Sequence, residues 1–153
     1  MTKPVQYVFV LWGKGFYEAS ATIFVTELRR AGLRVKVVGL TQRRTSGAFG
    51  LALVPDVTLD QILLAASHAI CLVIPYTSSG NNKLRSDPRL SQLFEQVSAN
   101  NGKFIIGQLD KEDRDLFPPT THKIVIDLSS ENLIRVAREL AHSLTQATGV
   151  GSE

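Results

Sequence analysis

The stretch VQYVFVLWGKGFYEASATIFVTELRRAGLRVKVVGL, residues 5–40, decides the fold expected for the chain. Residues 5–12 are β-branched and aromatic, a pattern typical of a strand that is buried on both faces of a parallel sheet. From residue 17 to residue 31 the apolar side chains recur at helical spacing, and Gly32 follows as a helix-ending residue. Residues 33–40 alternate as a second strand. Strand, helix and strand with short connections predict a right-handed βαβ unit.

The same alternation continues along the rest of the chain. The run AICLVIP, residues 69–75, is the most apolar and predicts a central strand. Further strands are expected at residues 103–109 and 123–127, a short one ends at Pro55, and residues 41–50 look like a loop. Helices are expected after Thr58, after Ser86 or Asp87 with Pro88 in the first turn, and over residues 129–146. The sequence therefore predicts one flavodoxin-like, three-layer α/β/α domain over residues 1–153, with a mostly parallel sheet and a disordered tail from about residue 148.

Composition narrows the class of protein. A chain of 153 residues with 44% hydrophobic and 20% charged residues is ordinary for a globular domain. The net charge of +3 is too small to argue for a nucleic-acid partner. No apolar run reaches signal-peptide or transmembrane length, and the one cysteine, Cys71, excludes an internal disulfide and fits a reducing compartment. We therefore expect a cytoplasmic protein with no membrane partner.

Cofactor and metal motifs are incomplete. Gly13 and Gly15 begin a dinucleotide fingerprint, but Glu18 stands at the place of its third glycine, where an acid would repel a pyrophosphate. The three histidines, His68, His122 and His142, are scattered and have no metal-ligand spacing. We expect no cofactor and no metal.

Polar residues follow three of the predicted strands, where open α/β sheets bind their ligands. The segments are GKGFYE (13–18), YTSSGNN (76–82) and GQLDKE (107–112). Glu18 near a helix start is either stabilised by the helix dipole alone or is an acid poised over a pocket. The segment YTSSGNN is either an anion cradle or a plain turn. Cys71, inside an apolar strand, is expected to be an inert small hydrophobe.

The order of these motifs resembles the ThiJ/PfpI superfamily of class I glutamine amidotransferase-like proteins over roughly residues 5–106. The segments that carry the resemblance are GFYEASATIFVTELRRAGLRVKVVGL, PDVTLDQI, AICLVIP and NNKLRSDPRLSQLFEQVSANNGKFII. The resemblance implies a homodimer, with the first helix and its flanking loops as the contact surface. It also places Glu18 where the family has a glutamate that donates a hydrogen bond to a cysteine thiolate. A carboxyl group must be protonated to donate in this way.

The chain departs from that family at three catalytic elements. Gln108 falls at or beside the nucleophilic cysteine, Leu109 and Asp110 follow where a histidine often stands, and Tyr76 and Thr77 replace a glycine pair that supplies oxyanion donors. We therefore expect a pseudoenzyme, a non-catalytic binding or regulatory homodimer with a small-molecule ligand. Its predicted pocket contains Glu18, Gln108 and Thr77 with Tyr76 at the rim, and its predicted ligand-binding residues are Gly15, Glu18, Tyr76, Thr77, Ser78 and Gln108.

Two alternatives stay open at this point. The first is a hydrolase, lyase or deglycase-type enzyme in which Glu18 is the general base for a hydroxyl of Thr77, Ser78 or Ser79. The second is a basic-surface module that binds a protein or nucleic acid through Arg43, Arg44, Lys83 and Arg85.

Overall fold

The structure is a computed structural model that describes residues 5–42, 44–64, 68–78, 84–119 and 121–148. A six-stranded sheet forms the middle layer, and all its neighbouring strands are parallel. In spatial order the strands are β5 (Val57–Thr58), β2 (Val35–Gly39), β1 (Tyr7–Trp12), β6 (Ala69–Ile74), β7 (Lys103–Ile106) and β8 (His122–Val125). The predicted parallel sheet is therefore confirmed, and the AICLVIP run lies in its interior.

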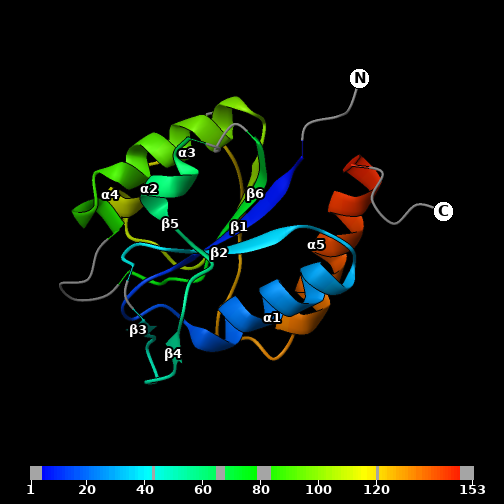
Figure 1. Cartoon of the computed structure of the whole chain (residues 1–153), viewed down its shortest axis with the longest axis horizontal. Helices are drawn as coiled ribbons and strands as arrows, with labels where there is room; N and C mark the ends of the chain where they lie inside the picture. The colour runs from blue at the N-terminus through cyan, green and yellow to red at the C-terminus, as the bar shows by residue number, and fades with distance from the viewer. Residues whose placement is uncertain (1–4, 43, 65–67, 79–83, 120, 149–153) are drawn as a thin grey trace.

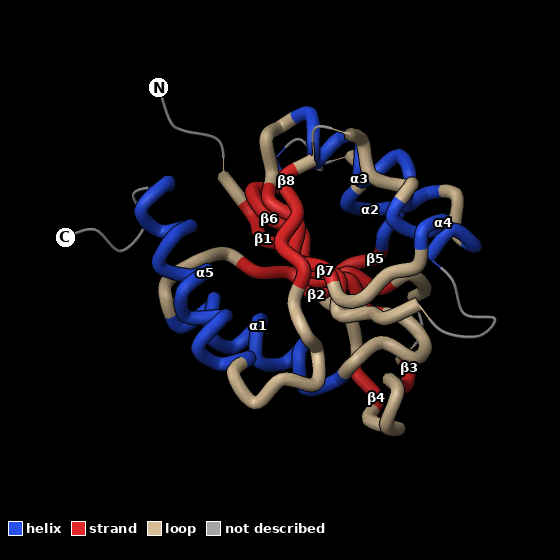
Figure 2. The backbone as a smooth tube through the Cα atoms, turned by 180° about the vertical axis from the view of Figure 1, so that it is seen from behind, coloured by secondary structure: helices blue, strands red, loops and turns tan. Residues whose placement is uncertain are grey.

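Helices cover both faces of this sheet. Helices α1 (Glu18–Arg30) and α5 (Leu133–Thr148) lie together on one face (Figure 1). The opposite face carries α2 (Leu59–Ile62), α3 (Arg89–Ala99), α4 (Lys111–Arg114) and the 3₁₀ turn Leu84–Ser86, as the view from behind also shows (Figure 2). The result is the single three-layer α/β/α domain that the sequence predicts. The predicted disordered tail falls on residues 149–153, outside the described residues.

The central strands are buried because their apolar side chains face a helical layer on each side. In β1, residues 8–12 are at most 2% exposed, and β6 is apolar throughout with five of its six residues buried. Strand β8 is different: it lies at the edge of the sheet and all four of its residues are exposed. The β1–β6 pair thus lies at the centre of the sheet. It is also the switch point of the topology, because the chain adds β2 and β5 on one side of β1 and then adds β6, β7 and β8 on the other side.

Several of the predicted helix boundaries are confirmed. Gly32 follows α1 with φ of 91°, a backbone conformation that glycine adopts without steric cost. Thr58 caps α2 in a capping box, in which its Oγ1 accepts from the Gln61 amide and Gln61 Oε1 accepts from the Thr58 amide. At α3 the capping prediction was wrong in detail. Pro88 is the cap residue, and Asp87 instead accepts from the Arg89 amide and pairs with its guanidinium at 2.6 Å.

The largest departure from the sequence prediction lies in residues 41–53. The predicted loop and the short strand before Pro55 form an antiparallel hairpin of β3 (Thr45–Ser46) and β4 (Ala52–Leu53), separate from the main sheet. Gly50 in its turn has φ of 91°, and the Trp12 indole Nε1 donates to the Thr45 carbonyl at 2.9 Å. The hairpin therefore sits against the carboxyl end of β1. In the part of the chain that the structure describes, none of the helices has the length and apolar character to cross a bilayer.

Candidate functional site at the carboxyl edge of the sheet

The loops that follow β1, β6 and β7 meet at one edge of the sheet. The Tyr17 amide donates to the Pro75 carbonyl at 2.8 Å, and the Ser78 amide donates to the Gln108 carbonyl at 3.0 Å. These bonds join three segments that are far apart in the sequence. The expectation that the polar loops leave the sheet on the same side follows from the parallel strand order and is confirmed.

Glu18 is the first residue of α1, and its carboxylate holds the β3–β4 hairpin. Its Oε2 accepts hydrogen bonds from the amides of Phe49 at 2.8 Å and Leu51 at 2.9 Å. A Cβ atom added to Gly47 would lie 2.5 Å from the carboxyl carbon of Glu18, so only glycine allows the turn to approach so closely. The side chain is 6% exposed. Glu18 is thus a buried acid that is held by a loop 31 and 33 residues further along the chain.

The same contacts set the protonation state of Glu18. Burial of the carboxyl raises its pKa, but hydrogen bonds from the backbone of Leu51, Phe49 and Ala48 and from its own amide outweigh burial and lower the pKa below its ordinary value of 4.5. Glu18 is therefore a carboxylate at neutral pH and can only accept hydrogen bonds. The ThiJ/PfpI resemblance implies a protonated donor at this position, whereas the lowered pKa favours the ionised form.

The second carboxylate oxygen of Glu18 is in a different situation. Oε1 is buried and has no hydrogen-bond partner among the described residues. Glu18 lines a cavity of about 480 Å³, here called the Glu18 cavity, between the start of α1, the hairpin turn and the segment that leads into α5. Its lining residues are Tyr17, Glu18, Ala19, Ile23, Phe49, Leu128, Ser129, Ser130, Glu131, Leu133 and Ile134.

Tyr76 lies in another cavity, on the other side of the sheet. This Tyr76 cavity has a volume of about 430 Å³ and is lined by residues that follow β1 and β2, among them Lys14 and Leu40, and by the start of α3, including Arg89. Tyr76 is 1% exposed, and its ring packs against Phe16 with a centroid distance of 5.1 Å. The tyrosine is therefore part of the packed floor and does not form a rim.

The predicted pocket residues are divided between the two cavities, with Glu18 lining one and Tyr76 the other. The Glu18 cavity is bordered by α5 and the Tyr76 cavity by α3, which cover opposite faces of the sheet. Gln108 has an exposed side chain, and Gln108, Gly15 and Thr77 line neither cavity. The shared pocket of Glu18, Gln108, Tyr76 and Thr77 therefore stays a prediction, and strand ends at one edge can direct side chains to two faces.

The position directly after β7 has no room for a side chain. A Cβ atom on Gly107 would lie 2.5 Å from the Tyr76 carbonyl oxygen and 2.7 Å from Leu128 Cδ1. Glycine fits at this position because it has no side chain, and the side chain of the next residue, Gln108, is exposed. A nucleophile at the end of this strand would need its neighbours to move.

Ser78 belongs to a network that sequence reasoning missed. Its Oγ donates to Asp113 Oδ2 at 2.7 Å and accepts from the Asp110 amide at 3.0 Å. Asp113 is fully buried and also accepts from the backbone amides of Leu84 and Arg85. The available sequence signal was the spacing of Asp110 and Asp113, since Asp110 caps α4 by accepting from the Asp113 amide at 2.9 Å. This network ties the loop after β6 to α4.

The remaining candidates have ordinary structural environments. Cys71 is buried in β6, and burial raises its pKa to about 12 although nearby Lys103 acts in the opposite direction. Arg85 is engaged by Asp110, Glu112 and Asp113, whereas Arg44 is exposed. Arg43, Ser79 and Lys83 lie outside the described residues. Among the described residues no three His, Cys, Asp or Glu side chains are grouped as metal ligands.

The fold and this edge define a flavodoxin-like α/β domain with its polar loops gathered at the carboxyl ends of the strands. The profile of the DJ-1/PfpI family matches residues 6–106, and the chain belongs to this family. No curated protein sequence matches the chain significantly.

Solved structures support the same fold. Oxidized DJ-1 from Toxoplasma gondii is 16% identical with a TM-score of 0.66, and the match covers 94% of this chain and 97% of that one. DJ-1beta from Drosophila melanogaster is 16% identical with a TM-score of 0.64, covering 96% and 99%. A ThiJ/PfpI domain protein from Brachyspira murdochii is 13% identical with a TM-score of 0.67, covering 95% and 99%. At these identities the likeness concerns the fold alone.

Proposed function

We propose that this chain is a non-catalytic binding or regulatory member of the DJ-1/PfpI family that has lost the cysteine chemistry. The observation that carries the proposal is the state of Glu18. Its carboxylate accepts from the Phe49 and Leu51 amides and has a lowered pKa, so it has no proton to donate to a thiolate at neutral pH. A residue in that state supports a loop and can accept from a ligand.

The environment of the expected nucleophile supports the same proposal. Gly107 and Gln108 follow β7, and neither is a nucleophile. The single cysteine of the chain, Cys71, is fully buried and its pKa is raised to about 12, so the reactive thiolate is scarce at neutral pH. The unpaired cysteine also fits the reducing cytoplasm as the compartment.

The two alternative functions have less support in the geometry. A general base must lie within hydrogen-bond reach of the hydroxyl that it activates. Ser78 instead donates to Asp113, and neither Ser78 nor Thr77 lines the Glu18 cavity. For a basic-surface module, the guanidinium of Arg85 already pairs with three acids of the 110–113 segment, which reduces its availability to an acidic partner.

The test is an activity comparison between the unaltered protein and two variants, Glu18→Ala and Gln108→Cys. Ester hydrolysis and deglycation of a model substrate are measured, with circular dichroism as the check on folding. We expect all three proteins to match the buffer rate, because the thiol restored at position 108 lacks the oxyanion glycines and histidine implied by the resemblance. Turnover by the unaltered protein that falls about a hundredfold or more in Glu18→Ala, the scale of a lost general acid or base, would overturn the proposal.

A further inference from the structure

Strand β8 is an exposed edge of the main sheet. It follows β7 in spatial order, and no strand of the described chain lies beyond it. All four of its residues are exposed, among them the apolar Ile124 at 44% and Val125 at 61%. Figure 2 shows β8 between the helical layers, with α5 on one side and α3 on the other. Because an edge strand with exposed apolar residues pairs readily with another extended chain, β8 can accept a further strand.

The hydrogen-bond register identifies the backbone groups of β8 that face outward. The Ile126 amide donates to the Ile106 carbonyl at 2.8 Å, and Val125 is the register partner of Ile106. Backbone groups of a strand alternate in direction, so those of Ile124 also point to β7. The N–H and C=O groups of Lys123 and Val125 therefore point away from the sheet, where a further strand would bond to them.

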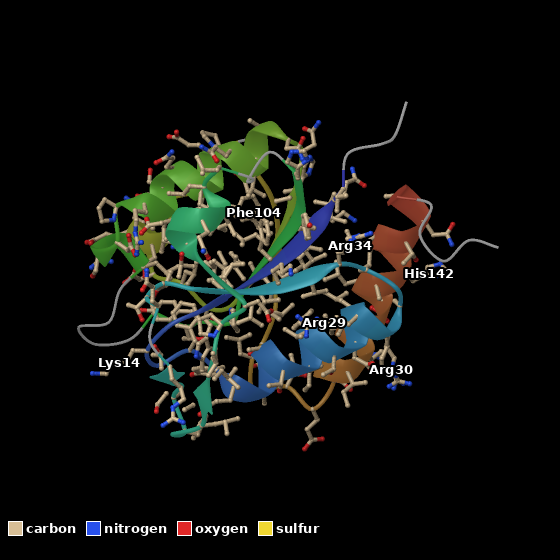
Figure 3. The ribbon with its side chains drawn as sticks, viewed as in Figure 1. Lys14, Arg29, Arg30, Arg34, Phe104 and His142 are labelled. Atoms are coloured by element: carbon tan, nitrogen blue, oxygen red, sulfur yellow. The ribbon has the colours of Figure 1, made fainter. Side chains whose placement is uncertain are left out.

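The side chains of Lys123 and Val125 lie on the face of the sheet that α3 covers. Lys123 is the register partner of Phe104, whose ring lies toward α3 and meets Phe94 of that helix edge to face (Figure 3). The ammonium of Lys123 lies 5.5 Å from the centre of the Phe117 ring. This cation–π contact keeps the positive charge of Lys123 close to the sheet.

The side chains of His122 and Ile124 lie on the opposite face, next to α5. His122 is the register partner of Lys103, whose Nζ donates to the Ser143 hydroxyl of α5 at 2.7 Å. A cavity of about 560 Å³ lies at the start of β7 and β8, and its lining residues are Asn101, Lys103, Thr121, His122, Lys123 and Ile124. This lining contains two lysines and a histidine but no acid.

The two ends of β8 differ in charge. Lys103 and Lys123 bring two positive charges to its start. The carboxyl end of α3 precedes β7, and α5 ends five residues after Ser143, so each helix dipole opposes the lysines with about half a negative charge. The two full charges exceed these two half charges. Asp127, the nearest acid along the chain, follows the other end of β8 and accepts from the Ser129 hydroxyl. The start of β8 is therefore positive and its far end is not.

This distribution favours one kind of occupant. Along β8 the residues are two basic side chains, His122 and Lys123, followed by two apolar ones. Pairing with a second copy of this chain would bring two such basic pairs together, and like charges across a strand pair are destabilising. Two acidic residues next to two apolar residues complement the same strand. Basic side chains at an edge deter like-charged chains, so they also select an acidic partner.

We propose that β8 binds an extended peptide with two consecutive acidic residues beside two apolar ones, which adds to the sheet as a seventh strand. Its backbone pairs with the outward groups of Lys123 and Val125, and its acids lie beside Lys103 and Lys123. The inference goes beyond the proposed function and is independent of it, because it uses neither Glu18 nor the residues directly after β7. Strands β6 and β7 separate β8 from β1, so this edge is distinct from the α1 surface predicted for the dimer.

The probes are acetylated and amidated hexapeptides that are added to the full chain. Thr-Glu-Glu-Val-Val-Thr complements β8 in parallel pairing, and Thr-Val-Val-Glu-Glu-Thr complements it in antiparallel pairing. In the control peptides lysine replaces both glutamates. Amide chemical shifts of the protein measure the affinity. We expect the better acidic peptide to bind about tenfold or more tightly than its lysine counterpart and to weaken as salt is added.

Hydrogen exchange separates strand addition from charge attraction alone. The bound acidic peptide should slow exchange of the Lys123 and Val125 amides about tenfold or more. The Ile124 amide already points to β7 and is the internal control, so its exchange should not change. Two further peptides are N-methylated at the odd or at the even positions. One of them should lose binding and the other should keep it, because only alternate amides of a strand face its neighbour.

Protein variants identify the groups that act. Val125→Pro removes an outward N–H at a place where edge strands tolerate proline, so the fold should persist and peptide binding should be lost. Lys123→Gln should weaken the acidic peptide about three- to tenfold, on the scale of exposed ion pairs. The matched control is Lys36→Gln, an exposed lysine on β2 that should have no effect. If circular dichroism shows that Val125→Pro unfolds, the two N-methylated peptides still decide.

Three results would overturn the inference. The first is equal affinity for the acidic and lysine peptides, or no binding of either at millimolar concentration. The second is that both N-methylated peptides bind like the parent, since backbone pairing is then not used. The third is a dimer in light scattering that Val125→Pro dissociates and the acidic peptide does not disturb, because a second copy would then cover β8.

Discussion

Replacement of Glu18 by alanine should release the β3–β4 hairpin from the start of α1. The carboxylate is the acceptor for the amides of Phe49 and Leu51, and the part of the turn at Gly47 packs against it. We expect the hairpin to lose its order in Glu18→Ala while the six-stranded sheet stays folded, because the sheet is built from separate contacts of β1 and β6.

The magnitude follows from three contributions. Each hydrogen bond to a charged group contributes about 1.5–3 kcal/mol, which favours the unaltered protein. The variant is relieved of the unpartnered Oε1, which costs about 1–3 kcal/mol. Phe49 is 86% exposed, so its freed amide can bond to water. The net loss should be about 2 kcal/mol, or roughly 4–8 °C in Tm for a domain of this size.

The assay combines urea unfolding followed by circular dichroism with hydrogen exchange at the two hairpin amides. Exchange protection of Phe49 and Leu51 should disappear in Glu18→Ala. Glu18→Gln retains a neutral acceptor for the two amides but buries an amide donor without a partner, so it should lose stability but less than Glu18→Ala. Since the folded pKa of Glu18 lies below 4.5, its contribution is complete above pH 4.5 and is lost as pH falls through the folded pKa. The difference between the unaltered protein and Glu18→Ala should therefore shrink in acid.

Two results would refute this reasoning. One is a Glu18→Ala variant whose stability lies within about 0.5 kcal/mol of the unaltered protein, the range of a neutral surface change. The other is unchanged protection of the Phe49 and Leu51 amides in that variant, because a second acceptor would then hold the turn.

Three further predictions concern the residues that follow β7, the Cys71 thiol and the oligomeric state. Gly107→Ala should lose about 1–3 kcal/mol in urea unfolding through overpacking, whereas Gln108→Ala should change stability by less than about 0.5 kcal/mol; equal effects would contradict the crowding at Gly107. Cys71 should react with a thiol reagent only after unfolding, and rapid stoichiometric labelling of the native protein would show an accessible thiol. The family resemblance predicts a homodimer through α1 and its flanking loops, and a monomer mass in light scattering at high concentration would count against it.

The sheet could be predicted from the sequence because its signals are strong and local. The runs at 5–12 and 69–75 contain almost only apolar residues, and such runs belong in the interior of a parallel sheet. The end of α1 was also predictable, since Gly32 has the positive φ that follows many helices. The β3–β4 hairpin was missed because its strands are two residues each and hydrogen bonds to Glu18 stabilise its turn. Tertiary bonds of that kind leave no periodic pattern in the sequence.

For the candidate site, the sequence predicted the edge of the sheet at which the polar loops meet but not the arrangement of their side chains. Parallel strand order places the loops after β1, β6 and β7 together, and the bonds from Tyr17 to Pro75 and from Ser78 to Gln108 bear this out. The face to which each side chain points depends on the one or two residues after each strand. Tyr76 packs against Phe16 in the cavity next to α3, whereas Glu18 bonds to the hairpin amides and lines the cavity next to α5.

The two oxygens of Glu18 explain how a position can keep its location in a family while its chemistry changes. The position at the start of α1 follows from the βαβ unit, and the helix dipole favours a charged acid there. What decides between a proton donor and a fixed carboxylate is the partner of that acid. Here the partner is a hairpin turn that supplies two amides to Oε2, which lowers the pKa and removes the proton that a thiolate would require. The remaining oxygen, Oε1, is buried with no hydrogen-bond partner among the described residues, so the turn holds the carboxylate through one of its two oxygens.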